Sequence, residues 1–227
     1  MKYFNIFCFC LSFLGLMAQP SVKTEIVSDL SKSFEGIIFF SMEMFSDTLY
    51  YTYYVKDKLV RMDEHNRCKN CKTPENYILY NLEKKTIIAV NPQRKMYLYL
   101  PVNEYHENKL NIDDYTILKT NNSKKILGYK CYQWRVRNKK QNTEIAYWVA
   151  KDNFDFFVDF LRLWNRSEKH ASYFLKIPDS YGYFPMLSEE RTTLREQKMT
   201  LRVISIQKKL LDKSLFIIPK DYKNYDE

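Results

Sequence analysis

The stretch GIIFFSMEMF at residues 36–45, followed two residues later by TLYYTYYV at 48–55, decides the fold class. Aromatic and β-branched residues, which are enriched in strands, fill both runs. Four similar runs follow between polar loops, at 58–63, 76–82, 86–90 and 95–100. Their close spacing predicts antiparallel neighbours joined by hairpins, because a parallel crossover needs about a dozen residues or more.

The second half of the chain continues this pattern. Further strands are predicted at 125–137, 144–150 and 199–208, with a last short run at 214–218. In the first of these, Tyr132, Trp134 and Val136 share one face of the strand. Gln133, Arg135 and Arg137 share the other face, which is therefore expected to meet water.

Two strands, 95–100 and 145–150, are apolar on both faces and need a second cover. The segment 152–164 is the candidate, because Asp152 or Asn153 can cap a helix there. Its polar residues fall on one narrow stripe and the rest is apolar, which predicts a helix buried on nearly all sides, typically inside a curved sheet. A weaker helix signal runs over 24–34, and 188–198 fits either a helix or an extended hairpin.

The chain begins with Met1 and Lys2, and an apolar run to Met17 is closed by Ala18-Gln19. This layout predicts a signal peptide at 1–18 that is cleaved between Ala18 and Gln19; a buried first strand is the alternative. Cys8 and Cys10 lie within the apolar run, where neither can become a lipidated first residue. We therefore expect a periplasmic or secreted product that is not a lipoprotein.

Residues 19–227 are predicted to form one domain, because no linker divides them and the length suffices for a hydrophobic core. The formal charge of +9 becomes +8 once Lys2 is removed, and the remaining Lys and Arg are scattered. Scattered charge indicates a solvated face, so nucleic acid is not an expected partner. Charged residues also interrupt the chain too often for a transmembrane segment in the mature form.

Cys68 and Cys71 form the motif Cys-Lys-Asn-Cys in a polar loop. In an oxidising compartment this pair is a candidate for a local disulfide; free thiols and a redox couple are the alternatives. Cys131 is interpreted as a small buried residue or a partner for one loop cysteine. His65 with the two loop cysteines gives three possible zinc ligands where structural zinc needs four, so no metal is expected.

The remaining motifs favour a non-enzymatic protein without a cofactor. After export only Gly36, Gly128 and Gly182 remain, and they are too isolated to build a phosphate-binding loop or a dinucleotide fingerprint. Neither a nucleophile elbow nor a paired-histidine zinc protease motif occurs. The carboxylate pairs at 63–64, 113–114 and 189–190 lie in polar stretches, where solvated charge is the default interpretation. No catalytic residue is predicted.

Four phrases carry a resemblance to a known family: Phe34-Glu35-Gly36-Ile37-Ile38, Ile126-Leu127-Gly128-Tyr129-Lys130-Cys131-Tyr132, Tyr147-Trp148-Val149-Ala150, and 215–222. Together they resemble exported bacterial families of unknown function related to the periplasmic lipoprotein carriers of the LolA and LolB type. The resemblance implies a strongly curved antiparallel sheet, a half-barrel, whose concave face is closed by helices and can hold acyl chains. This chain departs from the carriers in its loop with Cys68 and Cys71 and in the expected absence of a lipid anchor.

The expected function is therefore an exported binding protein for a lipid, an acyl chain or another apolar ligand. The expected contacts are Trp134 and Trp148 from the sheet with Phe157 and Leu161 from the helix. The alternative is a cell-envelope scaffold or protein-interaction module with a filled core, which binds an envelope protein through tyrosine-rich edges. A cavity beneath the helix distinguishes the two.

Overall fold

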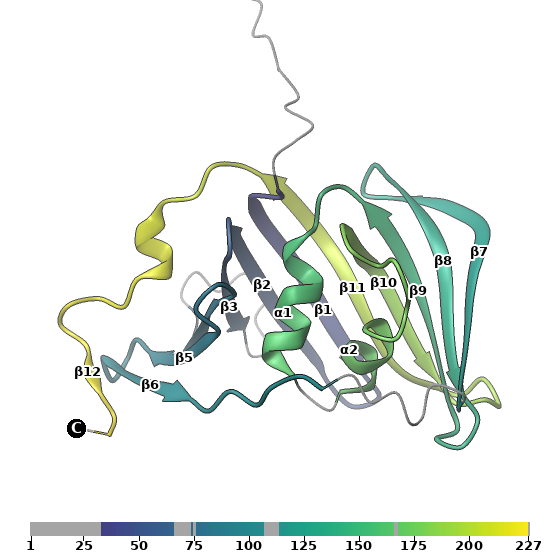
Figure 1. Cartoon of the computed structure of the whole chain (residues 1–227), viewed down its shortest axis with the longest axis horizontal. Coiled ribbons are helices and arrows are strands. Elements are labelled where there is room, and N and C mark those ends of the chain that lie inside the picture. The colour runs from purple at the N-terminus through teal and green to yellow at the C-terminus, as the bar shows by residue number, and fades with distance from the viewer. Residues whose placement is uncertain (1–32, 66–73, 75, 107–113, 166–167, 227) are drawn as a thin grey trace, which may run out of the picture. The chain divides into compact units, whose positions relative to one another are not determined.

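One sheet of twelve strands dominates the part of the chain that the structure describes (Figure 1). The structure is a computed structural model, and it describes residues 33–65, 74, 76–106, 114–165 and 168–226. The elements are β1 (Gly36–Met44), β2 (Thr48–Lys56), β3 (Leu59–His65), β4 (Asn76–Asn81), β5 (Thr86–Asn91), β6 (Met96–Leu100), β7 (Tyr115–Ile126), β8 (Tyr129–Asn138), β9 (Thr143–Lys151), α1 (Phe156–Trp164), α2 (Lys169–Phe174), β10 (Tyr183–Arg191), β11 (Gln197–Lys208), the short 3₁₀ helix η2 (Lys213–Phe216) and β12 (Lys223–Asn224).

The sheet is open and curved, and its strand order is β12-β6-β5-β4-β3-β2-β1-β11-β10-β9-β8-β7. Two meanders, β1–β6 and β7–β11, are joined because β1 pairs antiparallel with both β2 and β11. Only β12, which pairs parallel to β6, departs from the antiparallel pattern among the described strands. The predicted mainly-β class with a single large sheet is confirmed.

The six strands predicted before residue 101 all form, with ends within two residues of the expected positions. The segment 188–198 is an extended hairpin, since it contains the end of β10 and the start of β11. The prediction of one strand over 125–137 is wrong. Leu127 and Gly128 have φ values of 49° and 86°, and two consecutive positive φ angles make a tight hairpin turn between β7 and β8.

Helix α1 begins later than predicted, at Phe156, and its N-cap residue is Asp155. The expected capping by Asp152 or Asn153 is wrong: Asn153 has a φ of 53°, and the amides of Asp152 and Phe154 donate to the carbonyl of Gly182. The helix ends at Trp164 because Asn165 adopts a left-handed conformation. The weaker helix signal at 24–34 lies outside the described residues except for its last two positions.

The side chains of α1 pack on one face of the sheet, where both helices lie in Figure 1. Phe160 is fully buried, and its ring centroid lies 5.2 Å from that of Tyr53 and 4.9 Å from that of Tyr80. Phe157 packs at 4.6 Å from Phe184 of β10. Six of the nine residues of α1 are buried, whereas Arg162 on the polar stripe is exposed.

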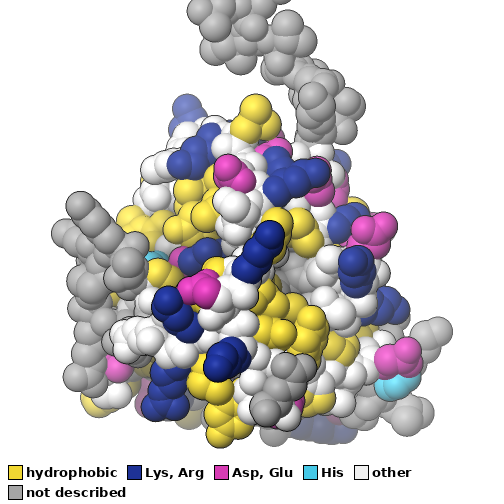
Figure 2. All heavy atoms as spheres, turned by 90° about the vertical axis from the view of Figure 1, so that its left-hand side faces the viewer, with side chains coloured by type: hydrophobic (Ala, Val, Ile, Leu, Met, Phe, Trp, Pro, Cys, Tyr) yellow, Lys and Arg dark blue, Asp and Glu magenta, His cyan; other side chains and the backbone are white. Residues whose placement is uncertain are grey.

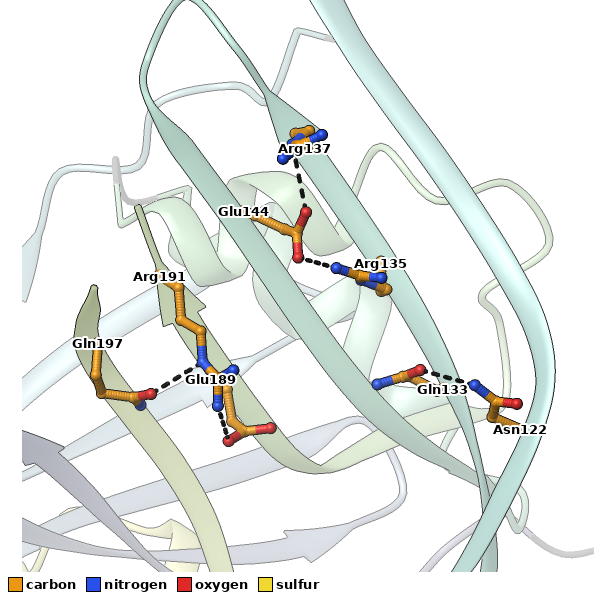
Figure 3. A network of polar contacts seen from close by, with 8 residues as sticks. All are labelled: Asn122, Gln133, Arg135, Arg137, Glu144, Glu189, Arg191 and Gln197. Atoms are coloured by element: carbon orange, nitrogen blue, oxygen red, sulfur yellow. Dashed lines mark hydrogen bonds and ion pairs between the residues drawn. The ribbon is translucent and has the colours of Figure 1, made fainter. Parts of the chain in front are cut away.

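The other face carries polar side chains over β7–β11, drawn in Figure 3 with the helices behind the strands. Arg135 and Arg137 of β8 both pair with Glu144 of β9, and Arg191 pairs with Glu189 at 2.9 Å. The prediction that the face of Gln133, Arg135 and Arg137 meets water is confirmed. Glu189 lies next to Ser188 in β10, so Ser188 faces the opposite, helix-covered side.

The chain after β11 runs along strands β3–β6 of the sheet. Its apolar run at 214–218 was predicted as a strand, which is wrong: the side chain of Asp212 accepts from the amide of Ser214 and starts η2. Ile218 and Tyr222 then pack against Tyr77 and Val90. On this side of the molecule, apolar side chains lie between dispersed Lys and Arg side chains (Figure 2).

Candidate functional site

A cavity of about 240 Å³ lies between α1, the start of α2 and the sheet. Strand register builds its floor: Phe40 of β1 is opposite Tyr51 of β2 on one side and Val203 of β11 on the other. Further apolar lining comes from Tyr53, Met62, Phe184, Phe157, Leu161 and Trp164. The helix and the sheet therefore do not pack solidly against one another at this point.

The rings in this cavity hold one another in place. Phe40 stacks on Tyr51 at 5.4 Å and meets Tyr53 edge-on at 4.8 Å, while Trp164 stacks on Phe160 at 5.8 Å. Large rings that are held by contacts with one another do not rearrange to fill the cavity, so the space between them persists. The cavity exceeds the roughly 150 Å³ that admits benzene in an apolar core.

A few polar side chains interrupt the apolar lining. Ser188 is 3% exposed, and its Oγ has no hydrogen-bond partner among the described residues. The buried Nδ1 of His170 likewise has none there. Two carboxylates, Glu64 at the end of β3 and Glu168 just before α2, also line the cavity. Unpartnered buried polar atoms are rare in folded proteins and call for a specific explanation.

Burial controls the protonation of the groups around the cavity. It lowers the pKa of His170 to about 4, so this imidazole is neutral at pH 7. Burial, followed by the negative charges of Glu64 and Glu168, raises the pKa of Tyr51 to about 12. Burial also holds the pKa of Tyr53 well above its ordinary value. The hydroxyls and the imidazole therefore act as neutral hydrogen-bonding groups, and the carboxylates supply negative charge.

Of the four ligand contacts expected from sequence, Phe157 and Leu161 line this cavity and the two tryptophans lie elsewhere. Trp134 is buried in the core at 4.6 Å from Tyr183. Trp148 is half-buried beside Tyr147 in β9, and the Nζ of Lys124 lies 4.1 Å from its ring. Because successive strand residues alternate, Trp148 points to the face opposite Tyr147, whose side chain faces the cavity.

The other predicted positions fall partly outside the described residues. Cys68, Cys71, Ala18 and Gln19 all do, so their disulfide and the cleavage site stay predictions. Cys131 is a buried free thiol whose Sγ donates to the carbonyl of Tyr129, and burial raises its pKa. Within the described ranges, no three His, Cys, Asp or Glu side chains come together as a metal site. No described helix is long and apolar enough to cross a membrane.

Sequence reasoning missed the polar residues of the cavity, Glu64, Glu168, His170 and Ser188. Spacing along β10 does not reveal Ser188, because the register shifts between Pro185 and Leu187 and interrupts the alternation that follows the inward-facing Phe184. The segment 188–198 was also open between helix and hairpin. The other three come from segments whose proximity depends on the tertiary fold.

Comparison with solved structures gives several similar folds at low identity. A conserved protein from Thermus thermophilus aligns over 84% of this chain and 90% of its own, at 10% identity and a TM-score of 0.45. A structure of the MucA/MucB complex of Pseudomonas aeruginosa aligns over 82% of this chain, at 7% identity and a TM-score of 0.49. The alignment covers 56% of the matched chain in that complex. A putative outer membrane lipoprotein-sorting protein domain from Vibrio parahaemolyticus aligns over 80% of this chain and 87% of its own, at 7% identity and a TM-score of 0.29.

A comparison with curated proteins gives no match. The family model described as "Domain of unknown function (DUF4412)" matches residues 34–222, which include every described strand except β12. This match confirms the resemblance to a family of unknown function that the four sequence phrases predicted. The chain belongs to the DUF4412 family.

Proposed function

We propose that this protein is an exported, non-enzymatic cell-envelope protein that binds a lipid or another apolar ligand in the cavity beneath α1. The observation that carries the proposal is the open volume of about 240 Å³ between aromatic rings of the sheet and the side chains of Phe157 and Leu161. In this proposal the sheet is a half-barrel, and the helices close its concave side.

The lining is suited to a hydrocarbon chain. Most of the residues around the cavity are aromatic or aliphatic, and small-molecule sites are typically apolar with a few placed polar groups. Burying a chain against them contributes about 25 cal/mol per Å² before the costs of ordering. The volume lies just below the roughly 300–1,000 Å³ usual for drug-sized ligands, which favours one chain of modest length.

Filling the cavity tests this proposal. Leu161→Trp and Met42→Trp each place a large ring in the space from opposite walls, the helix and the sheet. We expect native mass spectrometry, followed by organic extraction of gently purified mature protein, to show a bound apolar species in the unmodified protein. In both variants the amount of bound species is expected to fall by about tenfold or more, because a filled cavity excludes the hydrocarbon chain of the ligand.

Leu118→Trp is the matched control, because it adds the same ring at a half-exposed position of the edge strand β7. It is expected to keep the bound species. A clean apo mass for the unmodified protein, unchanged after incubation with lipid extract, contradicts the binding proposal and supports the scaffold alternative. Thermal unfolding of each variant shows whether the loss of ligand reflects filling of the cavity or loss of the fold.

A further inference from the structure

Ser188 gives the cavity a fixed hydrogen-bonding position. It is opposite Tyr147 of β9 and Leu201 of β11 in register, and both of these residues line the cavity. Ser188 is 3% exposed and its Oγ has no partner among the described residues. A buried hydroxyl left unpaired is destabilising, so this atom is expected to pair when a ligand with a polar group enters.

Negative charge exceeds positive charge among the described lining residues. Glu64 is opposite Tyr51 in register, and Glu168 lies just before α2. After the larger effect of burial, both carboxylates raise the pKa of the Tyr51 hydroxyl. An anionic group placed in the cavity therefore meets the half-buried carboxylate of Glu64 and the exposed carboxylate of Glu168, and water screens the second of these charges more than the first.

Within the described ranges, the cations near the cavity are engaged by other groups. Among the described lining residues, Arg202 is the cation, and its guanidinium lies 3.5 Å from the carboxylate of Glu43. Glu43 follows the cavity-lining Met42 in β1, so by strand alternation this ion pair lies on the opposite face of the sheet. Lys169 pairs with Glu190 at 3.8 Å and donates to Thr143. His170 is neutral at pH 7.

We infer that the cavity selects a single-chain amphiphile whose head group is uncharged or cationic and forms hydrogen bonds, and that it discriminates against free fatty acids. The inference rests on the proposed function and adds the chemical class of the ligand. The tail lies among the rings under α1, and the head group pairs with Ser188 and His170 within the field of Glu64 and Glu168.

Three ligands with the same tail test the selection: decanol, decylamine and decanoic acid, each used at pH 7.5 to displace the fluorescent apolar probe N-phenylnaphthylamine. Decanol and decylamine are expected to displace the probe at concentrations at least about tenfold lower than decanoate. In Glu64→Gln/Glu168→Gln the difference between decylamine and decanoate is expected to shrink by about tenfold or more. Ser188→Ala is expected to weaken decanol several-fold while probe binding stays unchanged.

The matched control is Glu144→Gln/Glu189→Gln, which removes two carboxylates from the opposite face (Figure 3) and is expected to leave all three affinities unchanged. Decanoate binding as tightly as decanol overturns the inference while leaving the proposed function intact. Equal effects of the control and cavity double variants also overturn it. Failure of the probe and of all three ligands to bind contradicts the proposed function itself.

Discussion

Truncation of Phe160 to alanine is expected to lower the free energy of unfolding by about 3–5 kcal/mol, the usual range for a large ring lost from a core. Phe160 is fully buried at the middle of α1, and it contacts Tyr53, Tyr80 and Trp164. Its removal deprives the helix of these ring contacts with β2 and β4. Urea or thermal unfolding followed by circular dichroism measures the change.

Phe45→Ala is the matched control, because Phe45 is fully exposed in the turn between β1 and β2. Removing the same side chain there is expected to change stability by less than about 0.5 kcal/mol. A loss of similar size in both variants contradicts the packing of α1 on the sheet. In that case Phe160 does not join the helix to β2 and β4.

The second large effect is expected for Gly36→Ala at the start of β1. Gly36 has a φ of 155°, and a Cβ atom there would lie 2.1 Å from the carbonyl oxygen of Gln207 in β11. The two backbones must separate, and this happens where β1 joins the two meanders of the sheet. In this variant the strained backbone conformation is expected to lower the free energy of unfolding by about 1–3 kcal/mol, and crowding against β11 by about 1–3 kcal/mol more.

Gly128→Ala separates these two contributions. Gly128 also has a positive φ, 86°, but no atom lies within 4 Å of its added Cβ, so only the conformational cost of about 1–2 kcal/mol applies. We expect Gly36→Ala to be clearly the more destabilising variant in the same unfolding measurement. Equal losses would show that the contact between β1 and β11 is less close than the structure has it.

The sequence predicts the first meander well because each run of aromatic and β-branched residues ends at a polar turn. Strand β7 was missed for the opposite reason. Its segment 120–125 reads Thr-Asn-Asn-Ser-Lys-Lys and is largely exposed, so an edge strand of this kind has no apolar alternation to reveal it. Pairing with β8 holds it extended, and that pairing is a tertiary property that strand propensity does not contain.

The candidate site could be predicted only in outline. The apolar pattern of α1 indicates a buried helix, and Phe157 and Leu161 follow from that pattern. Trp148 shows the limit: its strand is apolar on both faces, so the sequence could not tell which face the helix covers. The cavity itself is enclosed by α1, the start of α2 and strands that are distant in sequence, from β3 to β10 across the sheet, and no spacing along the chain encodes that arrangement.

The most direct measurement of the central claim is fluorescence quenching by a brominated hydrocarbon, dibromodecane, in two single-tryptophan proteins. Trp134→Phe/Trp148→Phe leaves Trp164 at the cavity, and Trp134→Phe/Trp164→Phe leaves Trp148 on the opposite face. Strong, saturable quenching of Trp164 with little effect on Trp148 is the predicted result. Equal quenching of both, or none of Trp164, contradicts a chain-binding cavity beneath α1.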